Sequence, residues 1–191
     1  MPDLSTREMI VQRADALFYE AGYEATSFAD IAAAVGISRG NFYHHFKTKD
    51  DILAAVISLR HRRTEAMLAR WEAEAETPKA RIFGFARLLI LNRAKILAHG
   101  CPVGTLCTEL AKLDHASRPE AAAIMALFRD WLARQFCAMG RDDADRLALY
   151  LLNWSQGTAV LAATFRDEAD LRAEVDRIED WLAALPETEP I

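Results

Sequence analysis

Residues 27–46 read SFADIAAAVGISRGNFYHHF, and the spacing within this segment decides the fold that we expect. Apolar side chains recur at the positions that hold two short helices together, namely Ile31, Val35, Ile37 and Phe42. Gly36 lies between these helices and can take a positive φ without steric cost, as a tight turn requires. The pattern predicts a helix-turn-helix, in which the second helix enters the major groove of DNA.

The second helix of this pair begins with a capping residue, because the Ser38 hydroxyl can accept a hydrogen bond from a backbone amide of the first turn. The next positions carry donors and aromatic rings suited to a major groove, namely Arg39, Gly40, Asn41, Tyr43 and His44. Glycine within a helix costs about 1 kcal/mol against alanine, so we expect Gly40 to let the backbone approach DNA closely. Arg39 and Asn41 are the expected base contacts, to guanine and adenine respectively.

Residues 31–53 follow the order Ile-Ala-x-x-x-Gly-Ile-Ser-x-Gly-x-Phe-Tyr-x-His-Phe-x-x-Lys-x-x-x-Leu. This order resembles the tetracycline-repressor (TetR) family of bacterial regulators, and the resemblance extends over about residues 6–56. It implies a three-helix DNA-binding domain at residues 1–48 and a helical effector-binding and dimerisation domain at residues 49–191. It also implies that a small-molecule effector releases the protein from double-stranded operator DNA.

The resemblance also suggests which side chains touch DNA. In this family the positions of Tyr43 and His44 contact phosphates or base edges, and Lys49 would hold a phosphate beside a helix N-terminus. Thr26 and Ser27, at the front of the first helix of the pair, are expected to add bonds to the phosphate backbone. Ser38, at the start of the second helix, is also expected to lie at the DNA. These contacts would set the position of the protein on DNA, and the base contacts would set the sequence that it prefers.

The charge of the chain gives no general support for nucleic-acid binding. The 191 residues carry a formal net charge of −5, and residues 1–60 hold six Lys or Arg against eight Asp or Glu. Attraction to phosphate depends on which face carries the cations. We therefore expect a local basic footprint at Arg39, Lys47 and Lys49.

The cysteines and the N-terminus predict a cytoplasmic protein with reduced thiols. Three cysteines are an odd and sparse set, and no basic segment precedes an apolar signal core at the N-terminus. Residues 148–165 carry no charge, but Asn153, Ser155 and Gln156 interrupt the stretch near the lower length limit for a span. We expect a buried interface helix there and no contact with a membrane.

Helix-start signals recur along the chain and predict an all-α protein of about nine helices. Capping patterns occur at Ser5 with Glu8, Ser27 with Asp30, Thr48 with Asp51, Thr77 before Pro78, and Ser117 with Glu120. Beyond the helix-turn-helix, apolar periodicity predicts helices at about residues 48–75, 78–97, 103–113, 117–139, 143–165 and 168–184. The long helix at 48–75 is the expected mechanical connection between the two domains.

Several side chains of the second domain are candidates for the effector site, because the resemblance places them on helices that surround the cavity. They are Phe85, Leu89, Phe128, Trp131, Asn153 and Trp154. Asn153 is the hardest to explain as packing, since a buried amide needs partners. Either the effector or a dimer interface could supply them.

Cys101 and Cys107, within the stretch HGCPVGTLCTE, allow three interpretations and complete the candidate ligand set. A zinc site would need ligands from elsewhere, because no Cys-x-x-Cys pair is present. A thiol sensor would use a thiolate near a helix N-terminus. The third interpretation is small cysteines packed beside a Gly-Pro turn at the pocket edge. We expect no bound metal and no cofactor.

The last two predicted helices suggest a homodimer. Gly157, Ala159, Ala162 and Ala163 would permit close approach of the helix at 143–165. In the helix at 168–184, apolar residues alternate by four and three at Leu171, Val175, Ile178, Leu182 and Leu185. Two subunits would complete a four-helix seam and read two half-sites. The alternative is that both helices pack only within one subunit.

The leading hypothesis is therefore a ligand-responsive transcriptional repressor. One alternative of the same fold is a repressor that senses electrophiles or oxidants through Cys101 and Cys107. Another is a helical assembly protein that has lost DNA binding. An enzyme is not expected, because the chain has no nucleophile elbow, phosphate loop, dinucleotide fingerprint or His-Glu-x-x-His motif.

Overall fold

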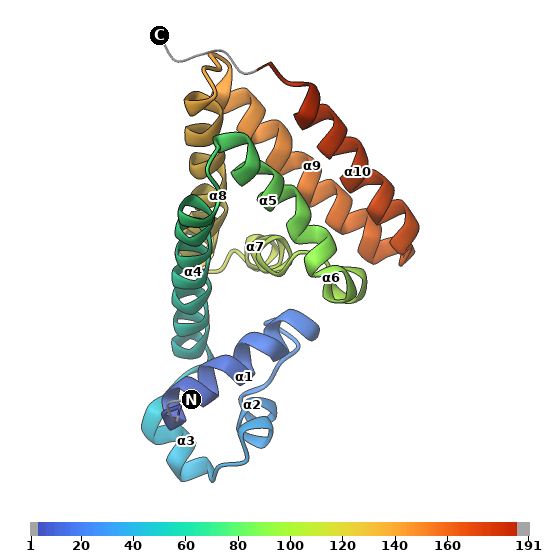
Figure 1. The fold of residues 1–191 in the computed structure, drawn as a ribbon. Helices are drawn as coiled ribbons and strands as arrows, with labels where there is room; N and C mark the ends of the chain where they lie inside the picture. The colour runs from blue at the N-terminus through green and yellow to red at the C-terminus, as the bar shows by residue number, and fades with distance from the viewer. Residues whose placement is uncertain (1–3, 187–191) are drawn as a thin grey trace. The chain divides into compact units, whose positions relative to one another are not determined.

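The regular structure of this chain is helical throughout the part that the computed structural model describes, which is residues 4–186 apart from the side chain of Arg39. Figure 1 shows the order of the helices. Their bounds are α1 Thr6–Glu20, α2 Phe28–Val35, α3 Arg39–His45, α4 Lys49–Glu74, α5 Pro78–Leu91, α6 Arg93–His99, α7 Pro102–Lys112, α8 Arg118–Ala138, α9 Ala144–Phe165 and α10 Glu168–Ala184. The all-α prediction is confirmed for this range.

The single helix expected at 78–97 is divided in two at Asn92, which accounts for the additional helix. The Asn92 backbone N–H and the side-chain Nδ2 both donate to the Leu88 carbonyl, at 3.0 and 2.9 Å. A side-chain amide that competes for backbone partners favours the end of a helix over its continuation. α5 therefore ends at Leu91, and α6 starts again at Arg93.

Side-chain caps confirm the predicted helix starts at Ser5, Ser27 and Thr48. Ser5 with Glu8 and Ser27 with Asp30 form complete capping boxes at α1 and α2. Ahead of α4, the Thr48 hydroxyl accepts from the Asp51 amide at 3.0 Å, and the Asp51 carboxylate accepts from the Thr48 amide at 2.9 Å. Each cap gives partners to amides that a helix leaves unpaired at its N-terminus.

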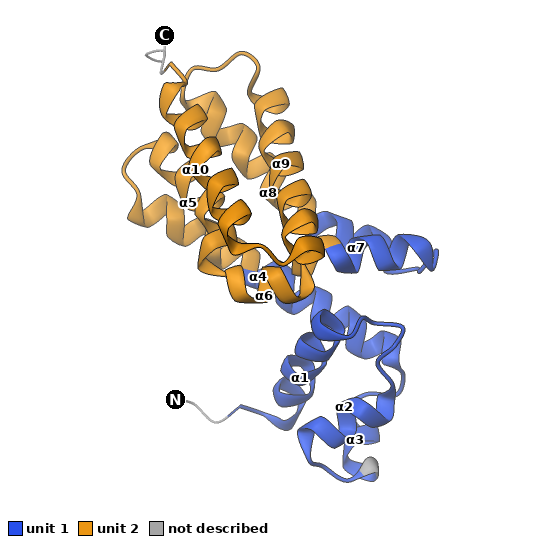
Figure 2. Ribbon diagram, turned by 90° about the vertical axis from the view of Figure 1, so that its right-hand side faces the viewer, with its two compact units in different colours: residues 1–63, 105–124 blue, residues 64–104, 125–191 orange. Residues whose placement is uncertain are grey.

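The chain divides into two compact units that do not follow the order of the sequence (Figure 2). Unit 1 comprises residues 1–63 and 105–124, and unit 2 comprises residues 64–104 and 125–191. The boundaries fall within α4, α7 and α8, so three continuous helices carry the chain from one unit to the other. The functional boundary at residue 48 stays a prediction.

Unit 1 is built around the helix-turn-helix and the first half of α4. Ile31, Phe42 and Phe46 are at most 2 % exposed and pack in its core. An ion pair fastens α4 to α1, because Arg60 Nε lies 2.6 Å from the Asp15 carboxylate and the Arg60 side chain is 8 % exposed. Burying a charged guanidinium costs desolvation free energy, and the ion pair with its hydrogen bond offsets that cost.

Unit 2 holds the larger apolar core. In this unit α10 packs along α5 and α9, and α6 packs on α9 (Figure 1). The core contains large side chains at most 1 % exposed, including Ile82, Trp131, Leu132, Phe136 and Leu151. None of the helices within residues 4–186 is both long and apolar enough to cross a lipid bilayer.

The apolar stripe of α10 belongs to this core, which corrects its assignment to a dimer seam. Leu171, Val175, Ile178 and Leu182 are at most 4 % exposed within the single chain. They pack in the clusters that α5, α6 and α9 also supply. The alternation by four and three thus arises from packing inside one subunit, as the alternative interpretation held for this stripe.

The turn between α2 and α3 gives a test of backbone conformation. Gly36 has φ +73°, and a Cβ added there or at Gly40 would meet nothing within 4 Å. Because a side chain in the left-handed region costs about 1–2 kcal/mol, Gly36→Ala is expected to lower the free energy of unfolding by that amount. Gly40 lies in α3 without a positive φ, so Gly40→Ala is the matched control and should raise stability by up to about 1 kcal/mol. Urea unfolding followed by circular dichroism measures both, and equal effects of the two variants would contradict the conformational explanation.

Candidate nucleic-acid interface

The helix-turn-helix has the geometry that the sequence predicts. α2 ends at Val35, and its C-cap Gly36 has a left-handed backbone and donates its N–H to the Ala32 and Ala33 carbonyls. Ser38 then caps α3, because its hydroxyl accepts from the Asn41 amide at 3.3 Å. Phe42 is fully buried, so the side of α3 opposite Phe42 faces solvent. The turn therefore presents one face of α3 to solvent.

Six predicted DNA-contacting residues, at the cap of α2 and on α3 with its cap, are exposed. They are Ser27, Ser38, Gly40, Asn41, Tyr43 and His44. The side chain of Arg39, the predicted guanine contact, lies outside the described residues. Tyr43 is 48 % exposed and stacks on Phe28 with ring centroids 5.0 Å apart. This stacking restricts the tyrosine ring, although about half of the side chain stays exposed.

Thr26 and Lys49 are already engaged within the protein, which changes what they can do. Thr26 is 2 % exposed, and its hydroxyl donates to the Gly22 carbonyl at 2.7 Å. The Thr26 hydroxyl is therefore not accessible to a phosphate in this structure, which corrects the expected contact. Lys49 is half-buried, and its Nζ donates to the carbonyls of Tyr23 and Glu24 at 3.0 and 3.3 Å. Two of its three N–H groups thus hold the α1–α2 turn.

Lys47 carries an exposed positive charge near α3. Its Nζ donates to the Tyr43 carbonyl at 2.6 Å, close to the C-terminus of α3. A cation at a helix C-terminus is stabilised by the carbonyls that have no partner in the helix. Lys47 therefore combines a capping contact with an exposed charge next to the recognition face.

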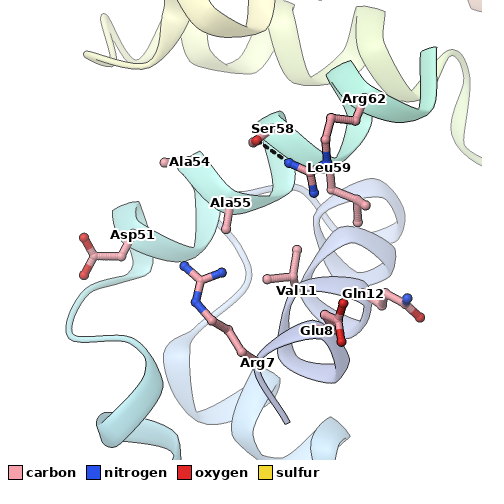
Figure 3. Close-up of a pocket in the computed structure, with 10 residues that line it drawn as sticks. All are labelled: Arg7, Glu8, Val11, Gln12, Asp51, Ala54, Ala55, Ser58, Leu59 and Arg62. Carbon is pink, nitrogen blue, oxygen red and sulfur yellow. Dashed lines mark hydrogen bonds between the residues drawn. The ribbon is translucent and has the colours of Figure 1, made fainter. Parts of the chain in front are cut away.

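A charged groove lies on the same unit but apart from this face (Figure 3). Its volume is about 400 Å³, and its walls are α1 and α4. The lining residues are Arg7, Glu8, Val11, Gln12, Asp51, Ala54, Ala55, Ser58, Leu59 and Arg62. The Arg7 guanidinium lies over the Phe46 ring at 4.5 Å. None of the predicted DNA-contacting residues lines this groove.

Most of the candidate effector residues pack together in unit 2. Phe85, Phe128, Trp131 and Trp154 belong to one apolar cluster, and Phe85 meets Phe128 with ring centroids 5.7 Å apart. Leu89 is 7 % exposed in the adjoining cluster, which Trp154 also contacts. The prediction that these side chains come together is therefore supported by their packing, whereas their contact with an effector stays a prediction.

Asn153 is exposed, which corrects the expectation of a buried amide. It lies on the outer side of α9, whereas Leu151, Leu152 and Ser155 face the core. The two candidate cysteines fall in different units. Cys101 is half-buried in unit 2 beside the Leu89 cluster, and Cys107 is half-buried on the part of α7 that belongs to unit 1.

Two donors of the unit 2 core have no acceptor in the described chain. They are the Nε1 atoms of Trp131 and Trp154, both of which are buried. Leaving a buried donor without a partner costs about 1–3 kcal/mol. Within residues 4–186, no group of three His, Cys, Asp or Glu side chains is placed to hold a metal ion.

One contact of unit 1 has no local signal in the sequence. The Glu109 carboxylate on α7 accepts from the backbone amides of Tyr23 and Glu24, each at 2.9 Å. The partners are separated by more than eighty residues, and Glu109 occurs in an ordinary helical pattern. The only hint is Gly22, which precedes the two amides and follows the end of α1.

Two family models of transcriptional regulators match separate parts of this chain. Residues 10–56 match the model described as bacterial regulatory proteins, tetR family. Residues 90–176 match the model of the LmrA/YxaF-like transcriptional regulator C-terminal domain. The first match covers the helix-turn-helix, and the second covers α6–α9 with part of α5 and α10.

Similar proteins match over nearly the whole length. The HTH-type transcriptional regulator TtgR of Pseudomonas putida is 25 % identical over 90 % of this chain and 87 % of its own. The HTH-type transcriptional repressor DhaR of a Mycobacterium species is 25 % identical over 97 % and 95 %. A TetR transcriptional regulator of known structure from Legionella pneumophila matches with a TM-score of 0.84 and 27 % identity, over 95 % of this chain and 99 % of that one.

The cap ahead of α4 generates a pH-dependent prediction. Hydrogen bonds from the Thr48 side chain, and then from the Thr48 amide, lower the pKa of the Asp51 carboxyl below its ordinary 3.8. A lowered folded pKa stabilises the protein fully above the unfolded value, and this contribution is lost as the pH falls through the folded value. Asp51→Asn should therefore lower stability at pH 7, and the gap to the wild type should shrink as the pH falls below about 4.

Urea unfolding at a series of pH values and a fixed protein concentration measures this gap. Asp180→Asn, an exposed position on α10, controls for the change in net charge. A gap for Asp51→Asn that stays constant down to acid pH would show that the ionised carboxylate is not what stabilises the cap.

Proposed function

Because the chain belongs to the tetracycline-repressor (TetR) family of bacterial transcriptional regulators, we propose that it is a repressor that binds operator DNA as a homodimer and leaves it when a small-molecule effector binds. The observation that carries the proposal is the exposed face of α3. It combines a left-handed turn, a serine cap and outward-facing Asn41, Tyr43 and His44 with a buried Phe42 on the opposite side.

In this proposal the side chains of α3 read the major groove. Asn41 and Arg39 contact base edges, and Tyr43, His44, Ser27 and Ser38 contact phosphates or base edges. Gly40 leaves open space above α3, which lets the DNA come close to the backbone. Lys47 adds exposed positive charge, while Lys49 acts chiefly by fixing the α1–α2 turn.

The outer face of α9 supports a homodimer. Exposed fractions of 50 % or more occur at Leu149, Tyr150, Val160, Leu161 and Phe165. With 3.6 residues per turn these positions lie on one side of the helix together with Asn153 and Gly157, opposite the buried side. An apolar face of this extent marks an interaction surface.

Gly157 supports close packing at this face, because a Cβ added there would meet nothing within 4 Å. Ala159 and Ala162 are instead at most 6 % exposed and face the core of their own chain. The proposed seam is therefore formed by the outer face of α9 against its copy, with α10 contributing its solvent side and not its apolar stripe.

The aromatic core of unit 2 supports the effector site. The Nε1 atoms of Trp131 and Trp154 are buried without an acceptor in the described chain. A mostly apolar molecule that carries hydrogen-bond acceptors would fill these bonds while packing against Phe85 and Phe128. We therefore assign the effector to this chemical class.

Release of DNA then requires only that the effector bind better to a conformation in which the two recognition helices no longer fit adjacent half-sites. The proposed action is a set of coupled binding equilibria in the cytoplasm without a catalytic step. Losing one bidentate base contact costs about 1–3 kcal/mol. A small change in the spacing of the two recognition helices is therefore enough to release the protein from operator DNA.

The base contacts are tested by measuring both affinity and salt dependence. The probe is a duplex enriched by the wild-type protein from a random-sequence pool. Arg39→Ala and Asn41→Ala should each weaken binding by about 1–3 kcal/mol and relax the preference at one base position. Lys47→Ala should weaken binding to all sequences alike and reduce the salt slope by about 1. Equal, sequence-independent losses for all three variants would refute the roles assigned to Arg39 and Asn41.

The dimer is tested within the exposed face of α9. Leu161→Glu places a charge where two copies would meet, and it should give a folded monomer because Leu161 is 55 % exposed in the single chain. Sedimentation velocity measures the mass, and circular dichroism checks the helix content. Leu91→Glu is the matched control, since Leu91 is 73 % exposed on α5 outside this face. A dimer that survives Leu161→Glu at micromolar concentration would contradict the proposed seam.

A further inference from the structure

A carboxylate from a distant helix sits on the turn that precedes the helix-turn-helix. The Glu109 Oε2 atom accepts from the Tyr23 amide and Oε1 accepts from the Glu24 amide, both at 2.9 Å. Each oxygen therefore takes one N–H, and hydrogen bonds to an ionised acceptor are stronger than those between neutral groups. Glu109 is half-buried, so solvent competes with these bonds only in part.

The backbone at Gly22 is shaped to admit this carboxylate. Gly22 has φ +93°, and a Cβ added there would lie 3.0 Å from Glu109 Oε1 and 3.4 Å from Oε2. Any other residue would carry a strained backbone, and its Cβ would press on the carboxylate so that Glu109 had to move by a few tenths of an ångström. The α1–α2 turn thus leaves space for a side chain that α7 provides.

The same turn is held from its other side by the start of α4. Lys49 Nζ donates to the carbonyls of Tyr23 and Glu24 and lies 4.2 Å from the centroid of the Tyr23 ring. The Tyr23 hydroxyl donates to the Asp50 carboxylate. The amides of residues 23 and 24 therefore bond to α7, whereas their carbonyls bond to α4.

The segment after α7 adds a second contact to this cluster. The His115 ring meets the Tyr23 ring edge-on at 5.2 Å, and its Nε2 lies 3.7 Å from the Asp50 carboxylate. Tyr23 itself is 3 % exposed. The α7 region therefore fixes the turn at two points, with Glu109 on the backbone and His115 on the side chain.

The position of α7 in the chain gives these contacts a consequence. The chain passes from unit 2 into unit 1 between Gly104 and Thr105, inside α7, so Glu109 lies about one turn beyond the crossing. On the other side, Ser27 begins the cap of α2 three residues after Glu24. A shift of α7 along or about its axis would move the carboxylate and release the turn on which α2 is mounted.

We propose that Glu109 is the positioning residue through which α7 sets the DNA-binding competence of the helix-turn-helix, an inference that rests on the proposed repressor function. With Glu109 on the two amides, α2 and α3 are held in the conformation that fits DNA. An effector bound in unit 2 acts by favouring a placement of α7 in which this carboxylate leaves the turn.

The test compares Glu109→Gln with the wild type in two measurements. Glutamine has the same shape, but its NH2 group cannot accept, so one of the two amides loses its partner. Amide hydrogen exchange at Tyr23 and Glu24 should accelerate at least tenfold, while protection in the rest of unit 1 is kept. Affinity for the duplex enriched by the wild type should fall at least tenfold with an unchanged salt slope, because no phosphate contact is removed.

The sign of the expected change separates positioning from electrostatics. Removing a negative charge near DNA would by itself strengthen binding. Glu20→Gln, on the exposed side of α1, removes the same charge without a contact to the turn and should leave both measurements within twofold of the wild type. A loss for Glu109→Gln alone supports the proposal.

Three results would overturn it. Wild-type amides at Tyr23 and Glu24 that exchange as fast as in an unstructured peptide would show that the carboxylate does not hold the turn, whatever the variants do. Faster exchange in Glu109→Gln with unchanged affinity would show that Glu109 holds the turn but does not affect DNA binding. That result would leave the proposed repressor function intact. A wild-type protein that enriches no duplex would remove the repressor function and the positioning role together.

Discussion

The DNA-reading part of this protein depends on short helices that could not form alone. α2 has eight residues and α3 has seven, whereas isolated helices shorter than about 12–15 residues are marginal in water. Their stability comes from the caps at Ser27 and Ser38 and from burial of Phe42 between them. Because the apolar contact of α3 lies on its inner side, Asn41 and His44 on the outer side stay exposed.

The features that the sequence predicts well are those whose cause is local. A cap needs a hydroxyl or carboxylate within three residues of the amides that it serves, so Ser5, Ser27, Ser38 and Thr48 could be found by spacing alone. The left-handed turn at Gly36 has the same local cause. The break at Asn92 has no such local signature, because an asparagine within an apolar helical pattern ends the helix in some contexts and remains exposed within it in others.

The features that the sequence does not predict depend on partners distant in the chain. The apolar stripe of α10 would look the same against α5 of its own chain or against a second subunit, since periodicity identifies a buried face and not its partner. Asn153 shows the converse: its place in an uncharged helix suggested burial, but α9 is apolar on two sides and the amide lies on the outer one. Lys49 was expected at a phosphate and instead holds the carbonyls of the α1–α2 turn.

The contacts of the α1–α2 turn can hold the helix-turn-helix in one conformation and still be broken by a small displacement. A turn held only by apolar contacts would be rigid in one packing, because interiors are close-packed and respond poorly to small shifts. The Glu109 carboxylate instead makes two directional bonds whose strength depends steeply on distance and angle. Displacing the Glu109 carboxylate from the turn by the length of a single hydrogen bond would therefore cost both bonds. A tenfold change in affinity needs only about 1.4 kcal/mol, which is within what the loss of such a pair can supply.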